Sequence, residues 1–124
     1  MSTRCSIEFK DAFGSFNVYQ HSDGYPSSIV PNIQRALKQA WELPRYEADE
    51  CGAAYVAANK TGAGNLRLMD GGPRAWVKIC DACYHYVVTL EGGELLVTVY
   101  TRSGDTTRRL FAKYRVTAAA VSLV

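Results

Sequence analysis

Apolar and polar side chains alternate in two short segments near the start of the chain, and this two-residue period constrains the fold more than any other feature. The segments are residues 4–10 (RCSIEFK) and 16–21 (FNVYQH). Successive side chains of a β-strand point to opposite faces of a sheet, so the alternation predicts two half-buried strands. Asp11 and Gly14 lie between the segments and favour a turn. We therefore expect a β-hairpin.

The hydrophobic period then lengthens to that of an amphipathic helix. In residues 29–43, apolar side chains recur three and four positions apart, which places them on one side of a helix. Pro31 fits only the first turn of this helix, and Pro44 ends it. Residues 45–60 predict a second helix, because their acidic side chains come first, where a helix N-terminus is partly positive.

The second half of the chain is rich in β-branched and aromatic residues separated by turn sequences. LEGGEL, at residues 90–95, is the clearest hairpin signal. The expected strands are residues 65–69, 75–80, 83–90 and 94–102, with residues 108–116 as a further candidate. The predicted order is two strands, two helices and then three to five strands. This order favours a single α+β domain, with an antiparallel sheet and both helices packed on one face.

The composition fits one folded domain and argues against several classes of protein. The chain has 124 residues, of which 48% are hydrophobic, so it can form a core of its own. A net charge of +2 is too small to indicate general nucleic-acid binding. No apolar run reaches the roughly 20 residues that a membrane-spanning helix needs, and the first ten residues lack the apolar stretch of a secretory signal. We expect a cytoplasmic protein with no membrane partner and with reduced thiols.

The segment HSDGYPSSIVP, residues 21–31, is the first candidate for a functional site. His21 and Asp23 could hold a metal ion, or form an acid–base pair in which the carboxylate orients the imidazole. The alternative is structural, because Asp23 and Gly24 also form turns. We favour a structural or ligand-contacting loop, since it lies where a strand meets a helix and binding groups often gather in such loops. Tyr25 completes this candidate binding edge.

The cysteines offer a second candidate. Cys80, Cys83 and His85, with the more distant Cys51, have donor atoms that suit zinc, and the C-x-x-C spacing also occurs in thiol redox sites. A redox motif would open a helix, whereas both flanks here predict strands, and no second pair of ligands accompanies it. We therefore expect buried thiols around a turn, with no metal and no cofactor. Whether the four side chains converge stays open.

Aromatic and basic residues supply weaker candidates. Tyr84 and Tyr86 share one strand face, where exposed rings could stack on a base or anchor a protein partner. Ordinary cross-strand packing is the simpler explanation for them. Arg108 and Arg109 belong to a basic cluster late in the chain, which could contact phosphates or an acidic protein surface, or could form a solvated strand face.

Several of these segments together resemble a family of small, mostly uncharacterised proteins of phages, prophages and bacterial mobile elements. The shared pattern is an opening Thr-Arg strand, then Tyr-x-His-x-Asp-Gly-Tyr-Pro before a helix, and later an Asp-x-x-Tyr-x-Tyr strand. It covers most of residues 1–100. The residues that match it are His21, Asp23, Gly24, Tyr25, Pro26, Asp81, Tyr84 and Tyr86. The resemblance implies an accessory role in the conflict between phage and host. The pattern has a polar residue or none where Cys80 and Cys83 fall, which further disfavours zinc.

These observations favour a non-enzymatic binding protein, for example an anti-defence factor that occupies a host protein or sequesters a small nucleotide signal. In that case His21, Asp23 and Tyr25 lie at the binding edge. The first alternative is a small hydrolase or nuclease, with His21 as general acid–base and Asp23 orienting it or holding a metal. The second is a homo-oligomeric structural or assembly protein, because an open sheet leaves edge strands that can pair between copies.

Overall fold

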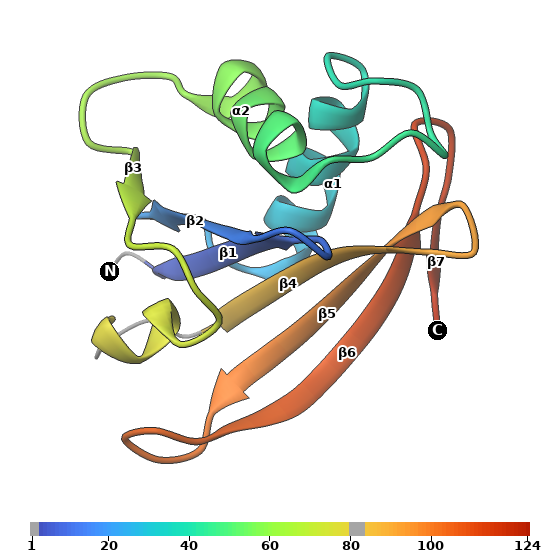
Figure 1. The fold of residues 1–124 in the computed structure, drawn as a ribbon. Coiled ribbons are helices and arrows are strands. Elements are labelled where there is room, and N and C mark those ends of the chain that lie inside the picture. Colours follow the sequence, from blue (N-terminus) through green and yellow to red (C-terminus); the bar gives the residue numbers. More distant parts are fainter. Residues whose placement is uncertain (1–2, 80–83) are drawn as a thin grey trace.

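The computed structural model describes residues 3–79 and 84–124 and has an α+β fold. Figure 1 shows two helices lying side by side over a strongly twisted sheet. The elements in chain order are β1 (Cys5–Lys10), β2 (Ser15–Gln20), α1 (Pro26–Leu37), α2 (Ala48–Asn59), β3 (Leu66–Met69), the 3-10 helix η1 (Ala75–Lys78), β4 (Tyr84–Glu91), β5 (Glu94–Arg102), β6 (Arg108–Val116) and β7 (Val121–Leu123).

The seven strands form one sheet in the order β3-β2-β1-β4-β5-β6-β7. The predicted sheet is antiparallel, and the observed one is mostly so, but β1 and β4 run parallel at its centre. Parallel neighbours need a long crossover connection, and here both helices and β3 lie between β1 and β4 in the sequence. The connection that carries the helices therefore brings the chain back in the same direction.

Several boundaries differ from the sequence prediction. Residues 75–78, expected as part of a strand, form η1, because Gly72 (φ 101°) and Pro73 turn the chain immediately before it. Helix α1 begins at Pro26, where a missing N–H costs nothing, so Pro31 lies in its second turn. Strand β7 carries no sequence signal that predicts it. The predictions that fall on residues 80–83 lie outside the described residues.

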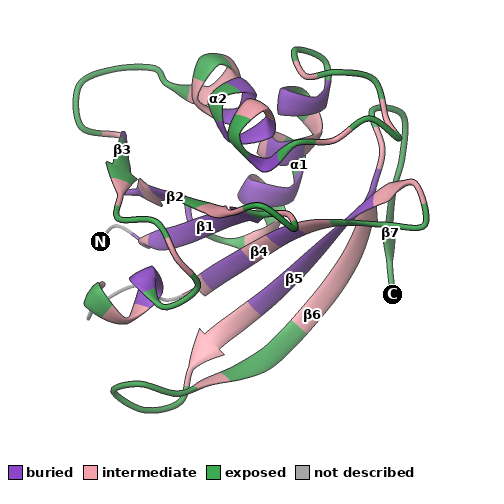
Figure 2. Ribbon diagram, viewed as in Figure 1, coloured by how far each residue is buried: buried purple, intermediate pink, exposed green. Residues whose placement is uncertain are grey.

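The hydrophobic core lies between the helices and the sheet. Every second residue of β1 contributes to it, namely Cys5, Ile7 and Phe9, all fully buried. Their partners come from α1, α2, β4 and β5, and Figure 2 shows the buried residues concentrated in these elements while the outer strand β7 is exposed. The alternation places one face of β1 toward the helices, but the strand is not half-buried as predicted, because Ser6 and Glu8 on its other face are buried as well.

That other side of the sheet carries a second set of buried side chains, which are polar. Its members are Ser6, Glu8, Asn17, His85 and Thr98. The chain between β3 and β4 packs onto this face, since Asn17 Nδ2 donates to the carbonyl oxygen of Asp70 (3.1 Å) and the rings of Trp76 and His85 lie 4.8 Å apart. We call this side of the sheet the polar face.

Candidate functional site

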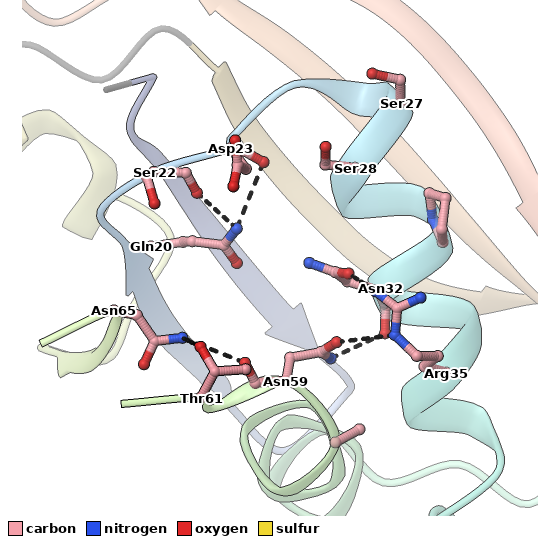
Figure 3. Close-up of a pocket in the computed structure, with 12 residues that line it drawn as sticks. Gln20, Ser22, Asp23, Ser27, Ser28, Asn32, Arg35, Asn59, Thr61 and Asn65 are labelled. Carbon is pink, nitrogen blue, oxygen red and sulfur yellow. Dashed lines mark hydrogen bonds between the residues drawn. The ribbon is translucent and has the colours of Figure 1, made fainter. Parts of the chain in front are cut away.

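A polar cavity of about 510 Å³ lies between α1, the end of α2 and the loop that follows β2 (Figure 3). Its lining residues are Gln20, Ser22, Asp23, Ser27, Ser28, Pro31, Asn32, Arg35, Ala58, Asn59, Thr61 and Asn65. Pockets for small molecules have volumes of roughly 300–1,000 Å³, so the cavity can hold a small ligand. We call it the α1–α2 cavity.

The loop at the edge of this cavity is held by backbone contacts. Asp23 has a φ of 56°, which is uncommon for a residue other than glycine. The next residue, Gly24, donates its N–H to the Thr3 carbonyl (2.8 Å) and accepts a hydrogen bond from the buried Tyr86 hydroxyl (2.6 Å). A Cβ atom at position 24 would lie 2.9 Å from the Thr3 oxygen, so glycine is needed there. The carboxylate of Asp23 is therefore carried on a fixed backbone.

Amide side chains form much of the cavity wall, and their hydrogen-bonding atoms are largely in use. Gln20 Nε2 donates to the Ser22 carbonyl (2.8 Å), while Gln20 Oε1 accepts from the Tyr55 hydroxyl (2.7 Å). Asn59 Nδ2 donates to the carbonyl oxygens of Asn32 and Tyr55, both at 3.0 Å, and so ties α2 to α1. The walls are thus held in place by the protein itself, before any ligand binds.

Four other side chains in the cavity have no hydrogen-bond partner within the described part of the chain. They are the carboxylate of Asp23 and the hydroxyls of Ser22, Ser27 and Ser28. Pro31 lacks the N–H that would bond to the carbonyl oxygen of Ser27 in an ordinary helix, which leaves that oxygen without its helical partner. This part of the cavity therefore presents hydroxyls and oxygen acceptors to a ligand.

Arg35 adds a positive charge to the cavity. It projects from α1 between Asn32 and Asn59, as Figure 3 shows, and its Nε donates to the Asn59 side-chain oxygen (3.4 Å). A second nitrogen of the guanidinium contacts the Asn32 side-chain oxygen. These contacts orient the guanidinium, yet no carboxylate within residues 3–79 and 84–124 pairs with it. An anionic group on a ligand would supply that missing partner.

His21, the residue predicted to pair with Asp23, lies outside the α1–α2 cavity. Its Nδ1 is 2.9 Å from the Tyr19 hydroxyl, and the imidazole lines a neighbouring hollow of about 370 Å³. That hollow shares Ser22 and Asn65 with the cavity. His21 and Asp23 are only two positions apart in the chain, yet no hydrogen bond or ion pair joins their side chains in the described residues. The structure therefore does not arrange them as an acid–base pair.

Two of the candidate tyrosines meet at the surface, and the third is in the core. Tyr25 and Tyr84 have ring centroids 6.1 Å apart, and Phe111 extends them into a row, 5.5 Å from Tyr84. Tyr25 and Phe111 are about half exposed, at 48% and 54%. We call these three residues the aromatic row. Tyr86 is fully buried, and its hydroxyl holds Gly24, so it contacts no ligand directly.

The two candidate arginines belong to a different part of the surface. Arg109 is exposed, whereas Arg108 is half-buried, with its guanidinium 4.2 Å from the centre of the Tyr100 ring and 5.0 Å from that of Trp76. Neither arginine lines the α1–α2 cavity.

The candidate metal ligands do not form a site in the described part of the chain. No group of three or more histidine, cysteine or acidic side chains gathers there. Cys51 is buried on α2, and burial raises the pKa of its thiol to about 12, so it stays protonated. His85 lies on the polar face. Cys80, Asp81 and Cys83 fall outside the described residues.

A wider hollow of about 690 Å³ lies beside β3 and η1 and is a weaker candidate. Its charged residues are Arg67, Asp70 and Lys78. Lys78 pairs with Asp70, and the Arg67 guanidinium lies 5.0 Å from the centre of the Tyr19 ring. These charges have partners within the chain, whereas the α1–α2 cavity keeps unpaired groups.

Asp23 is the one cavity residue that the sequence indicates as a site residue; the others carry no such signal or a weaker one. One signal in the sequence could have indicated part of the cavity. Polar residues recur four and three positions apart at Ser28, Asn32 and Arg35, which places them on one side of α1. Asn59 and Asn65 reach the cavity only because α2 packs on α1, and no local pattern indicates that contact.

Comparison with known proteins gave no match to any protein-family model, curated protein or solved structure. Among the described residues, no helix is both long enough and apolar enough to cross a lipid bilayer.

Proposed function

We propose that this chain is a non-enzymatic binding protein that holds a small polar ligand in the α1–α2 cavity. The observation that carries the proposal is a preformed cavity of about 510 Å³ whose walls are tied by internal hydrogen bonds while Asp23, three serines and Arg35 keep free bonding capacity. Preformed walls reduce the entropy lost on binding, which favours affinity for a small ligand.

A nucleotide is the ligand class that these groups suit best. A carboxylate such as Asp23 accepts hydrogen bonds from ribose hydroxyls, as acidic residues do in dinucleotide-binding proteins. A guanidinium such as Arg35 pairs with phosphate oxygens in a bidentate manner. The serine hydroxyls can donate or accept, so they fit either part of the ligand.

The biological setting that we propose rests on the resemblance to small phage and mobile-element proteins. In that setting the protein would act in the cytoplasm as an anti-defence factor that sequesters a nucleotide signal of the host. Binding without turnover agrees with the absence of a hydrogen bond or ion pair between His21 and Asp23 in the described part of the chain, because a hydrolase in which Asp23 orients His21 needs the two side chains in contact.

The test is to close the cavity without removing any of its hydrogen bonds. Ala58 lines the cavity, whereas its neighbour Ala57 is exposed on the same helix. Calorimetric titration with nucleoside monophosphates, nucleoside diphosphates and cyclic dinucleotides should give saturable binding to the unmodified chain and to Ala57→Trp, and none to Ala58→Trp. Equal binding by the two tryptophan variants, or no binding by any nucleotide, would reject the proposal.

The aromatic row favours a second candidate function, the binding of a host protein. Exposed tyrosine and phenylalanine side chains are enriched in protein interfaces, and Tyr25, Tyr84 and Phe111 lie in contact with one another. Phe111→Arg should abolish capture of the partner from host lysate. Phe13→Arg is the matched control, because Phe13 is 97% exposed and lies outside the row. Equal capture by both variants would exclude the row as the interface.

Self-association is the third candidate, since β3 and β7 are the edge strands of the sheet. Unpaired backbone groups on an edge strand can pair with a second copy. Light scattering at several concentrations tests it, and a monomeric mass throughout would exclude it.

A further inference from the structure

Three side chains with hydrogen-bond donors surround the Trp76 indole on the polar face of the sheet, away from the α1–α2 cavity. The His85 ring lies 4.8 Å from the Trp76 ring, and the guanidinium carbons of Arg102 and Arg108 lie 4.7 Å and 5.0 Å from it. The strand register explains the grouping, because Arg102 on β5 is directly opposite Arg108 on β6, and His85 on β4 is opposite Tyr100 on β5. We call the three residues the Trp76 cluster.

Arg102 is a fixed member of this cluster. Its Nη2 donates to the carbonyl oxygens of Trp76 (3.0 Å) and Ile79 (2.9 Å), and its Nη1 donates to that of Asp105 (2.5 Å). The guanidinium therefore holds η1 against the sheet. Its Nε is buried and has no hydrogen-bond partner among the described residues, so one donor of this cation is unused.

His85 supplies a second unused atom at the same place. It is 0% exposed, and its Nδ1 is 2.7 Å from the Ser6 hydroxyl. Its Nε2 is also buried without a partner. These two nitrogens, on His85 and Arg102, are the only buried side-chain polar atoms in the described part of the chain that lack a partner. When Ser6 donates to Nδ1, the ring proton lies on Nε2, which is then a donor. Burial, followed by the charges of Arg102 and Arg108, lowers the pKa of His85 to about 3, so the ring is neutral at physiological pH.

Arg108 is the outermost member of the cluster. It is half-buried between the rings of Tyr100 and Trp76, and burial lowers the pKa of its guanidinium. No hydrogen bond or ion pair connects the Arg108 side chain to another described residue. The charge of the buried Glu8 carboxylate acts on the Arg108 guanidinium, but Glu8 Oε2 already accepts a hydrogen bond from Ser15 Oγ (2.6 Å). A half-buried guanidinium with no bonded acceptor is unfavourable, and an anion would relieve this cost.

We propose that Arg108, Arg102 and His85 form a second binding site, which takes a phosphate-type oxyanion. Among the described residues, Arg102 Nε and His85 Nε2 have no acceptor, the Arg108 guanidinium has none either, and a tetrahedral oxyanion has several acceptor oxygens. Arginine favours phosphate because its planar fork can donate two hydrogen bonds to one anion. The indole of Trp76 gives the site an apolar wall, where charge-assisted hydrogen bonds are stronger than in water. The site is independent of the proposed function, because no residue of the Trp76 cluster lines the α1–α2 cavity.

The probe for this site is inorganic phosphate, added to the ¹⁵N-labelled full chain at neutral pH while chloride keeps the ionic strength constant. The Arg102 Nε–H signal and the Trp76 indole signal should shift saturably in nuclear magnetic resonance spectra. Arg108→Gln should weaken this binding by about tenfold or more, the loss expected for one charge-assisted contact. Arg109→Gln, the same change at the exposed neighbouring residue, should keep the affinity within about twofold, because surface charges interact weakly.

Further variants and probes separate the explanations. Arg108→Lys keeps the positive charge but loses the planar guanidinium fork. Its affinity for phosphate should lie between that of the unmodified chain and that of Arg108→Gln. Arg35→Ala changes the α1–α2 cavity and should leave the phosphate-induced shifts of the Arg102 and Trp76 signals unchanged, so either proposal can fail alone. Both probes are compared at the Arg102 and Trp76 signals, because the α1–α2 cavity is itself proposed to bind nucleotides. Tighter binding of a nucleoside monophosphate there would identify the oxyanion as part of a larger ligand, and equal binding would identify free phosphate; both support the site. An absent shift, or equal weakening by Arg108→Gln and Arg109→Gln, would overturn it.

Discussion

The unmodified protein should lose stability in mild acid, and replacing His85 with glutamine should abolish most of this acid-induced loss. The buried imidazole has its pKa lowered from 6.5 to about 3, first by burial and then by the neighbouring guanidinium charges. In the unfolded chain the same group takes up a proton near pH 6.5. As the pH falls below that value, protons bind the unfolded state and not the folded one. The free energy of unfolding therefore decreases until the pH approaches the folded pKa.

The size of this effect follows from the pKa difference. Each pH unit between the two pKa values is worth about 1.4 kcal/mol, so lowering the pH from about 7 to about 4.5 should cost about 2 to 3 kcal/mol. The side chain is 0% exposed, so solvent screening does not reduce the estimate. A loss of this size is a large fraction of the roughly 5–15 kcal/mol that stabilises a typical domain.

Urea unfolding at the two pH values measures the effect. The quantity compared is the change in free energy of unfolding between the two pH values, because glutamine also alters packing and the contact with Ser6. His85→Gln should lack the decrease of about 2 to 3 kcal/mol. His21→Gln is the matched control, since it removes the other histidine of the chain and leaves His85 in place. An equal acid-induced loss in His85→Gln and the unmodified chain would show that His85 does not cause the loss.

Three further predictions concern the contacts that position the loop and the helices. Tyr86→Phe should lower the free energy of unfolding by about 1 to 3 kcal/mol in urea, because the carbonyl of Gly24 loses its buried donor; an unchanged midpoint would contradict this. Gly24→Ala should cost about 1 to 3 kcal/mol in the same assay, since its Cβ would lie 2.9 Å from backbone and side-chain atoms; a stability equal to that of the unmodified chain would show that the loop adapts. Asp11→Ala should destabilise the fold by about 1 kcal/mol at neutral pH, because Asp11 Oδ2 accepts the first N–H of α2 from Ala48 (2.8 Å). Hydrogen bonds from Ala48 and then Phe13 lower the pKa of Asp11, so this contribution should be lost as the pH falls through the folded pKa of the carboxyl, and a pH-independent difference would argue against it.

The local parts of the fold were predictable from the sequence because local patterns encode them. The alternation in β1 and β2, the amphipathic period of α1 and the two glycines between β4 and β5 each report on the conformation of their own segment. The parallel pairing of β1 with β4 was not predictable in this way, because it joins strands separated by both helices. Residues 75–78 read as a strand because Trp76 and Val77 favour strands, yet Trp76 packs on the polar face from a 3-10 turn.

In the candidate site, too, local patterns indicate some features and long-range packing determines the others. Asp23 and Gly24 stand out in the sequence because turn residues cluster there, and the structure gives both special backbone positions. Tyr84 and Tyr86 share a strand face as predicted, but only tertiary packing makes Tyr84 partly buried and Tyr86 fully buried beneath the loop at Gly24. Asn59 and Asn65 enter the cavity through tertiary packing alone. The sequence therefore indicates the loop that borders the cavity, and the packing of α2 on α1 creates the cavity itself.

Native mass spectrometry can show whether the α1–α2 cavity binds a small ligand. The unmodified chain, Ala57→Trp and Ala58→Trp would each be incubated with a protein-free small-molecule extract of bacterial cells and then weighed under native and denaturing conditions. We expect a mass excess that disappears on denaturation for the unmodified chain and Ala57→Trp, and a bare chain mass for Ala58→Trp. A mass excess retained by Ala58→Trp, or a bare mass for the unmodified chain, would contradict it.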